Sequence, residues 1–282
     1  EQQNYTEEAA EQAISAYKNE KLQEDDKRTE YLIDRVKKTV LRTVTTIREQ
    51  LQNTRLAPEL FEADFQYQAP GLSFNGKIDR VDLYEDAQKC YVKIMDYKSG
   101  NTQLDLNKVY HGLQMQLGLY LDAMITELEK EKPGKEIIPA AMLYYHVFNP
   151  MVERSADSVA EIMKELRPDG LINKDEVVLK HLDSEFLPED GPEGYAQNAG
   201  LREKVNGKYL PVRTKKDGVL YDSAALVSKE NFEHLRSYLK NRVERFSDEI
   251  QNGNAKANPY RYKKEHACEY CKFKAVCSFA GL

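Results

Sequence analysis

Residues 76–100 read GKIDRVDLYEDAQKCYVKIMDYKSG, and we expect this stretch to form a β-hairpin. Two segments rich in β-branched and aromatic residues, 74–84 and 91–98, flank a polar tip at 86–89. Residues of these types favour strands, and a short polar segment between two of them is typical of a hairpin turn. The hairpin therefore supplies two adjacent antiparallel strands to the predicted fold.

The register of this hairpin brings acidic side chains together. Side chains alternate between the two faces of a strand, so folding about the tip places Val81 opposite Ile94 and Asp79 opposite Asp96. Directly opposed residues have Cβ atoms about 4.5–5.5 Å apart, close enough for two carboxylates to hold one divalent cation. Two such carboxylates are costly to bury alone, so either one is protonated or a cation binds there. Lys98 lies two residues beyond Asp96 on the same face.

A divalent metal beside a lysine suits hydrolysis of a phosphodiester. The metal orients and deprotonates water and shields the phosphate charge, and the lysine stabilises the negative charge that develops. The alternative is an exposed hairpin whose charges face water. The convergence of Asp79, Asp96 and Lys98 on one end of the hairpin favours the catalytic interpretation.

A helix is expected soon after the hairpin. Asp105 can cap a helix that runs from about residue 107 to residue 131. Gly112, Gln116 and Tyr120 are spaced by four and so share one face of that helix. Gln116 can orient a water or a phosphate, and Tyr120 can donate a hydrogen bond. The alternative is that both side chains satisfy backbone groups.

These motifs together resemble a known family. The segments GKIDRVD at 76–82 and DYKSG at 96–100, followed by Gln116 and Tyr120, resemble the RecB-type branch of the PD-(D/E)XK nucleases. The resemblance implies an α/β, restriction-endonuclease-like fold, in which a mixed sheet is flanked by helices. We expect extra helices and a carboxy-terminal cysteine segment around that core.

The resemblance also implies roles for individual residues. Asp79, Asp96 and the Tyr97 carbonyl would bind Mg²⁺ or Mn²⁺, and Lys98 would polarise the scissile phosphate or the water. The implied catalytic set is Asp79, Asp96, Lys98, Gln116 and Tyr120. A histidine that the family usually carries on a helix upstream of the core has no counterpart before residue 59.

Three cysteines, Cys268, Cys271 and Cys277, lie together near the carboxy-terminal end of the sequence. Their spacing suits a 4Fe–4S cluster with a fourth ligand from elsewhere, or a zinc site that His266 could complete. The resemblance implies an iron–sulfur cluster whose fourth cysteine lies upstream of the nuclease core. Cys90 is the remaining cysteine, and we expect it to be a bystander at the hairpin tip. The sequence therefore predicts a cluster that this chain cannot fully ligate.

The charge balance limits how the chain meets DNA. A net charge of −6 and a pI near 5.6 argue against strong autonomous binding to DNA. One segment mixes basic and aromatic residues, as in proteins that contact phosphates and stack bases. These residues are Tyr260, Arg261, Tyr262, Lys263, Lys264, Tyr270, Lys272, Phe273 and Lys274.

The resemblance, which is closest to AddAB-type helicase–nucleases, implies partners as well as chemistry. The substrate would be DNA, with degradation of the strand that ends in 5′ during double-strand break repair and recombination, and the partner would be an AddA-type helicase–nuclease subunit. No apolar run approaches the roughly 18 residues of a membrane span, and no signal peptide is evident, so we expect a cytoplasmic protein.

We expect four parts: a helical part at 1–58, the nuclease core at 59–150, an elaboration at 151–227, and a final helix with the cysteine segment at 228–282. Residues 28–51 show one apolar stripe that predicts core packing, and a short strand is expected near Val177. Two alternative functions stay open. One is a CRISPR-associated iron–sulfur exonuclease that shares the core, and the other is a DNA-clamping module that does not hydrolyse DNA.

Overall fold

The predicted hairpin forms the centre of the fold. The computed structural model describes residues 8–9, 11–16, 27–150, 152, 158–188, 200–263, 265–269 and 271–277. Strands β2 (Leu72–Glu85) and β3 (Lys89–Lys98) pair in antiparallel fashion. Asp86 closes the turn, because its Oδ1 atom accepts hydrogen bonds from the amides of Gln88 and Lys89 at 2.8 and 2.7 Å. The hairpin prediction is confirmed.

The described part of the chain builds a mixed sheet in the order β1-β2-β3-β4-β5-β6. The remaining strands are β1 (Ala57–Ala69), β4 (Glu136–His146), β5 (Asp169–Asn173) and β6 (Leu226–Val227). Neighbouring strands are parallel at β3/β4 and β5/β6 and antiparallel at the other three junctions. This is the expected α/β architecture, with a mixed sheet flanked by helices.

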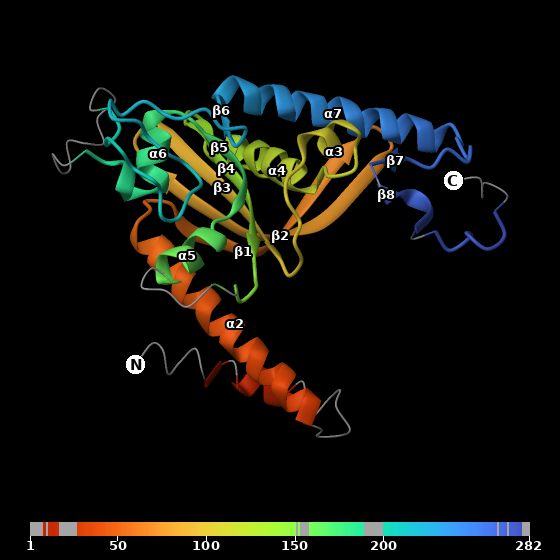
Figure 1. Cartoon of the computed structure of the whole chain (residues 1–282). Coiled ribbons are helices and arrows are strands. Elements are labelled where there is room, and N and C mark those ends of the chain that lie inside the picture. Colours follow the sequence, from red (N-terminus) through yellow and green to blue (C-terminus); the bar gives the residue numbers. More distant parts are fainter. Residues whose placement is uncertain are drawn as a thin grey trace.

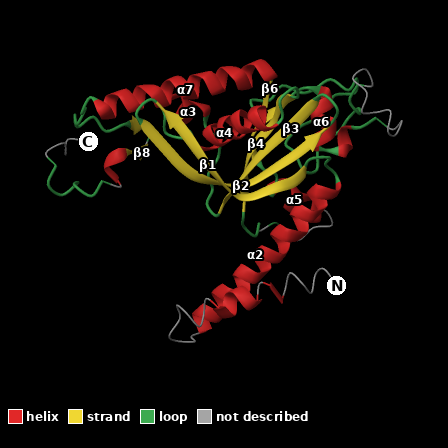
Figure 2. Cartoon of the chain, turned by 180° about the vertical axis from the view of Figure 1, so that it is seen from behind, coloured by secondary structure: helices red, strands yellow, loops and turns green. Residues whose placement is uncertain are grey.

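Helices cover both faces of the sheet (Figure 1). Helices α4 (Gln116–Glu131) and α7 (Lys229–Gln251) lie on one face and contact each other and β1 and β4. Figure 2 shows α2 (Lys27–Gln52) on the other side, where it extends away from the sheet. The shorter helices are α3 (Leu106–Tyr110), α5 (Ser158–Glu165) and α6 (Glu176–Leu182). Residues 8–9 and 11–16 are also helical.

Two apolar clusters hold these layers together. One joins the α4/α7 face to the sheet and includes Val81, Ile94, Leu121 and Phe232, each at most 1% exposed. The other lies under α6 on the opposite face and includes Leu201, Leu210 and Val212. The region 151–227 therefore contributes β5, β6 and part of a core, and the division into four parts stays a prediction. Among the described helices, none is long and apolar enough to cross a membrane.

The single helix predicted at 107–131 is wrong, because the segment forms two helices. Gly112 has φ +77°, which takes the chain out of the right-handed helical region between α3 and α4. A Cβ atom at this position would lie 2.6 Å from the Phe246 ring of α7. Gly112 therefore does not share a helical face with Gln116 and Tyr120. Asp105 does cap α3, since its side chain accepts from the Asn107 amide.

Two further sequence expectations need correction. The apolar stripe of α2 is only partly covered, since Val36 is 52% and Val44 is 40% exposed while Thr43 and Thr46 are buried. The stripe extends beyond the sheet (Figure 1), so only its carboxy-terminal part, which includes Ile47, packs against the core. Val177 lies in α6 rather than in a strand, because Asp175 caps the helix by accepting from the Val177 and Val178 amides.

Candidate active site

The hairpin register places the two acidic residues side by side. Val81 pairs with Ile94, as predicted, and the ladder ends at the pair of Arg80 and Met95. The next position on each strand carries Asp79 and Asp96. Asp79 Oδ2 accepts a 2.7 Å hydrogen bond from the amide of Tyr97, which ties the first carboxylate to the strand that carries the second.

Asp96 lies in an environment that disfavours its charge. The residue is 2% exposed. Burial raises the pKa of its carboxyl group, and Asp79 raises it further, while Lys98 opposes both effects. Asp96 Oδ2 lies 2.5 Å from Lys98 Nζ as an ion pair. The buried carboxylate is therefore held next to the ammonium group of Lys98.

A line of polar contacts leads from this carboxylate to α4. Lys98 Nζ donates to Gln116 Oε1 at 3.2 Å, and Gln116 Nε2 donates to Tyr120 Oη at 2.5 Å. Burial raises the pKa of Tyr120, with smaller contributions in the same direction from Asp96 and Asp79, so the hydroxyl stays neutral. Its ring packs edge-on against Phe65 of β1 at 5.0 Å. The structure thus brings together all five residues of the predicted catalytic set.

Local hydrogen bonds fix where α4 begins. Gln114 lies just before the helix and accepts from the Asp105 amide at 2.8 Å through Oε1. Its Nε2 atom donates to the Gln103 carbonyl at 2.9 Å. These bonds attach the segment after β3 to the start of α4, and so they position Gln116 above Lys98.

The residues fit a hard divalent cation. Two carboxylates and a backbone carbonyl at Tyr97 are oxygen donors, and Mg²⁺ in proteins is commonly held by one or two carboxylates together with waters. The burial of Asp96 next to Asp79, which disfavours two negative charges at one point, supports this fit. Within the described ranges, no three acidic, histidine or cysteine side chains lie close enough together to hold a metal ion. A metal bound by Asp79 and Asp96 would therefore also need the Tyr97 carbonyl and water as ligands.

Sequence reasoning missed an ionic network on the opposite face of the same strands. Arg80 donates to both oxygens of Asp82 at 2.6 Å, and Lys93 Nζ lies 2.7 Å from Asp82 Oδ2. All three side chains are at most 8% exposed. Burial opposes the charge of Asp82, yet Lys93 and Arg80 hold its pKa below the usual range. The predicted hairpin register already implied this ion pair, because it sets Asp82 directly across from Lys93.

The network connects to the candidate metal site through Tyr97. Arg80 Nη1 donates to the Tyr97 hydroxyl at 3.2 Å. The side chain of Tyr97 therefore contacts the ionic network, while its backbone amide contacts Asp79 on the other face. Arg80 and Asp82 are positioning residues for the strand that carries Asp96 and Lys98.

The three carboxy-terminal cysteines lie in the segment that follows α7. Cys268 is half-buried, and Cys271 and Cys277 are exposed. The segment is attached to α3, because Tyr262 Oη donates to Asp105 Oδ2 at 2.9 Å and Lys108 pairs with Glu265 at 2.7 Å. Cys90 is buried at the start of β3, and burial raises the pKa of its thiol to about 11. This is consistent with an inert thiol.

The basic and aromatic segment near the carboxy terminus is largely open to solvent. Tyr260 is 40% and Phe273 is 70% exposed, and Arg261, Lys272 and Lys274 are exposed as well. Lys264 and Tyr270 lie outside the described residues. The proposed contact with DNA stays a prediction.

The fold and the motif residues define a nuclease-like domain, and comparison with known proteins identifies its class. Residues 1–278 match the family model described as the PD-(D/E)XK nuclease superfamily, and the chain belongs to this superfamily.

Among curated relatives, the chain is similar to proteins named as the B subunit of an ATP-dependent helicase/deoxyribonuclease. It is 39% identical to the one from Lachnoclostridium phytofermentans over 256 residues, which cover 91% of this chain and 22% of the relative. The identity is 34% to the protein from Thermoanaerobacter sp. and 32% to that from Clostridioides difficile, each over 89% of this chain and 22% of the relative. The chain thus spans about a fifth of the length of these relatives.

Proposed function

We propose that this chain is a metal-dependent deoxyribonuclease domain that hydrolyses phosphodiester bonds in DNA. The observation that carries the proposal is the continuous line of contacts from Asp96 through Lys98 and Gln116 to Tyr120, with Asp79 beside it. Two opposed carboxylates next to a lysine, one of them the buried Asp96, are well suited to phosphoryl chemistry and poorly suited to a purely structural role.

Each residue has a distinct task in this proposal. A bound Mg²⁺ or Mn²⁺ would supply Lewis acidity and lower the pKa of a water. Asp79, Asp96 and the Tyr97 carbonyl would hold that ion. Lys98, fixed by Asp96 and Gln116, places a positive charge where negative charge develops on the phosphate. Gln116 orients Lys98 and Tyr120, and the neutral Tyr120 hydroxyl can donate a hydrogen bond to a phosphate oxygen.

The biological setting is inferred from the relatives. Their name describes one subunit of an ATP-dependent helicase/deoxyribonuclease. We infer that this chain acts on DNA within such a complex, with an AddA-type helicase–nuclease subunit as its partner. Degradation of the strand that ends in 5′, action in double-strand break repair and recombination, and a cytoplasmic location belong to the same proposal.

The test is cleavage of labelled single-stranded and double-stranded DNA by the purified chain with Mg²⁺ or Mn²⁺. Asp96→Ala should abolish cleavage while the circular dichroism spectrum is retained. Asp34→Ala is the matched control, because Asp34 lies on α2 with its side chain 60% exposed. Cleavage by a folded Asp96→Ala variant at the rate of the parent chain would refute the assignment. DNA binding without any metal-dependent cleavage would instead indicate a DNA-clamping module.

For the cysteine segment, we infer that Cys268, Cys271 and Cys277 supply three ligands of a 4Fe–4S cluster whose fourth ligand this chain lacks. The chemistry of three clustered thiolates supports this assignment. Iron analysis and the absorption spectrum near 400 nm test it. Substoichiometric, labile iron is expected, and a stable stoichiometric cluster in the purified chain would contradict the missing fourth ligand.

A further inference from the structure

A groove runs along the edge of the sheet, and none of the five catalytic residues lines it, although Phe65 in its β1 wall packs against Tyr120. It has a volume of about 760 Å³ and lies between β1, α4 and α7. One wall is formed by six consecutive residues of β1, 64–69. The other wall is formed by three adjacent pairs of α4 residues, 122–123, 126–127 and 130–131, which recur every four residues and so share one face of the helix.

The β1 wall is the edge of the sheet. β1 pairs with β2 on one side, and no other strand in the described part of the chain pairs with its outer side. An edge strand presents unpaired backbone N–H and C=O groups that can accept another strand. A groove between an edge strand and a helix is a known geometry for peptide binding by strand addition.

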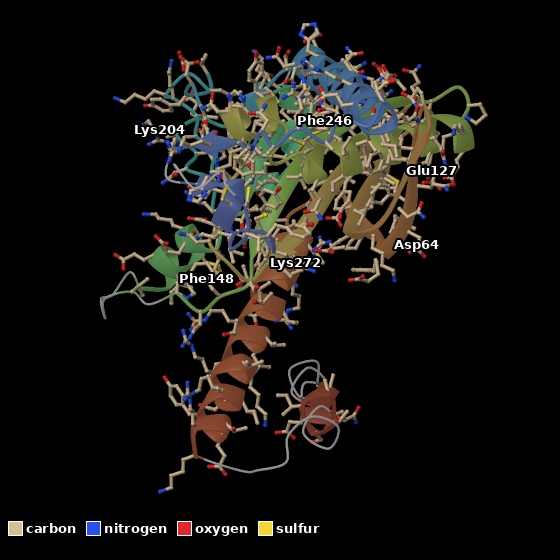
Figure 3. All side chains as sticks on the ribbon, turned by 90° about the vertical axis from the view of Figure 1, so that its right-hand side faces the viewer. Asp64, Glu127, Phe148, Lys204, Phe246 and Lys272 are labelled. Carbon is tan, nitrogen blue, oxygen red and sulfur yellow. The ribbon has the colours of Figure 1, made fainter. Side chains whose placement is uncertain are left out.

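The groove is strongly acidic. Carboxylates outnumber lysines among its lining residues by five to two. The acidic members are Asp64, Asp122, Glu127, Glu131 and Glu244, and the basic ones are Lys130 and Lys240. Figure 3 shows Asp64 and Glu127 on the same flank of the molecule, one from each wall. This charge repels DNA phosphates and attracts basic groups.

One carboxylate at the base of the groove is already neutralised within the chain. Asp122 is 1% exposed, and its Oδ1 atom accepts from Arg236 at 2.8 Å and lies 3.3 Å from Lys240. Burial raises the pKa of the neighbouring Tyr67 hydroxyl, and the charge of Asp122 and a hydrogen bond to it raise that pKa further. The exposed carboxylates of Glu127 and Glu131 therefore remain to meet a basic group that enters the groove.

We propose that this groove binds an extended, basic segment of a partner protein, which adds to β1 as a further strand. Side chains alternate along such a strand, so every second residue would point toward α4. Lysine or arginine at those positions would meet Glu127 and Glu131, which lie one helical turn apart. Backbone pairing with β1 would supply affinity, and the acidic wall would supply specificity.

A second copy of this chain is a poor occupant. β1 reads APELFEADFQYQA, with three carboxylates and no basic residue, so pairing two β1 edges would oppose like charges. The docking role does not depend on hydrolysis of DNA, since the groove contains none of the five catalytic residues.

The test uses fluorescence anisotropy with the labelled heptapeptide KVKTKVK and the 282-residue chain. The control is the same peptide with every backbone amide N-methylated, which keeps the charge and removes the N–H donors that strand pairing needs. The expected result is saturable binding of the first peptide and at least tenfold weaker binding of the second, a difference of about 1.4 kcal/mol. Equal binding of the two peptides would show nonspecific charge attraction and overturn strand addition.

Charge reversal locates the binding site. The variant Glu127→Lys with Glu131→Lys should weaken peptide binding at least about tenfold. The matched control is Glu161→Lys with Glu165→Lys on α5, which also reverses two glutamates four residues apart. Unchanged affinity in a folded groove variant, or equal loss in both variants, contradicts the proposal. Dimerisation in analytical ultracentrifugation that only the groove variant abolishes would assign the groove to a second copy instead.

Discussion

The backbone amide of Tyr97 donates a 2.7 Å hydrogen bond to the carboxylate of Asp79. The hydroxyl of the same tyrosine accepts from Arg80 at 3.2 Å on the other face of the sheet. One residue thus joins a candidate metal-binding carboxylate to a buried ionic network. Because side chains alternate along strands, an ionic pair on the back face restricts the register that aligns Asp79 with Asp96 on the front.

Replacement of Arg80 tests how much this network contributes to the free energy of unfolding. Arg80→Met should lower it by about 3 kcal/mol, because Asp82 would stay buried with Lys93 as its remaining cation. Urea unfolding followed by circular dichroism measures the change. Lys38→Met is the control, since the Lys38–Asp34 pair is exposed and its loss should leave the free energy of unfolding nearly unchanged. A loss below about 1 kcal/mol for Arg80→Met would contradict a positioning role.

Lys98 should act on the rate of hydrolysis as well as on stability. Lys98→Met should lower kcat for DNA cleavage by about 100-fold or more, the usual effect of removing a group that stabilises transition-state charge. The Tm should also fall, because Asp96 stays buried without its ion-pair partner, so kcat is measured at a temperature at which circular dichroism shows the variant folded. Lys229→Met is a suitable control, because Lys229 pairs with Glu136 at the other end of the neighbouring strand. If Lys98→Met weakens DNA binding but leaves kcat unchanged, Lys98 is a binding residue only.

The parts of the fold that depend on local sequence were predictable. The hairpin follows from β-prone segments around a polar tip, and Val81 does pair with Ile94. The family resemblance indicated Gln116 and Tyr120. These two residues do share one helical face, because they are four positions apart and both lie within α4. Short-range pattern and family motifs were therefore enough to predict where the five candidate catalytic residues meet.

Features that depend on distant neighbours were not predictable. The break between α3 and α4 places Gly112 against Phe246 of α7, 134 residues further along the chain (246 − 112). The apolar stripe of α2 predicted burial, yet whether a partner layer exists cannot be read from the stripe itself. The network of Arg80, Asp82 and Lys93 was missed because charged residues in a strand usually face water.

Gly112 should tolerate no side chain. Gly112→Ala combines a φ of +77° with a Cβ atom 2.6 Å from the Phe246 ring, so we expect a loss of about 2 kcal/mol in the free energy of unfolding. Gly134→Ala is the matched control, because it has φ +97° and no heavy atom within 4 Å of its Cβ position. Gly134→Ala should lower the free energy of unfolding only through backbone strain, by about 1 kcal/mol. Equal losses in urea unfolding would show that the contact with Phe246 is not limiting.

The free energy of unfolding should depend on pH through Asp183. The residue is 0% exposed, and its Oδ1 atom accepts from the Glu185 amide at 2.9 Å. Burial raises the pKa of this carboxyl group to about 7, with Glu185 adding and with Lys93 and Arg167 opposing. The native state therefore keeps a proton that the unfolded chain has already released between about pH 4 and pH 7, so this group makes folding less favourable as the pH rises through that window.

Asp183→Asn removes this titration while it keeps an acceptor for the Glu185 amide. The free energy of unfolding of the variant, relative to the parent chain, should increase by on the order of 2 kcal/mol between about pH 5 and pH 8. Urea unfolding at one-unit intervals measures this difference. Asp217→Asn, at an exposed turn, should follow the pH dependence of the parent chain. If the Asp183→Asn variant shows the same pH dependence as the parent chain, then Asp183 is ionised throughout this pH range in the native state, and Lys93 and Arg167 compensate its charge.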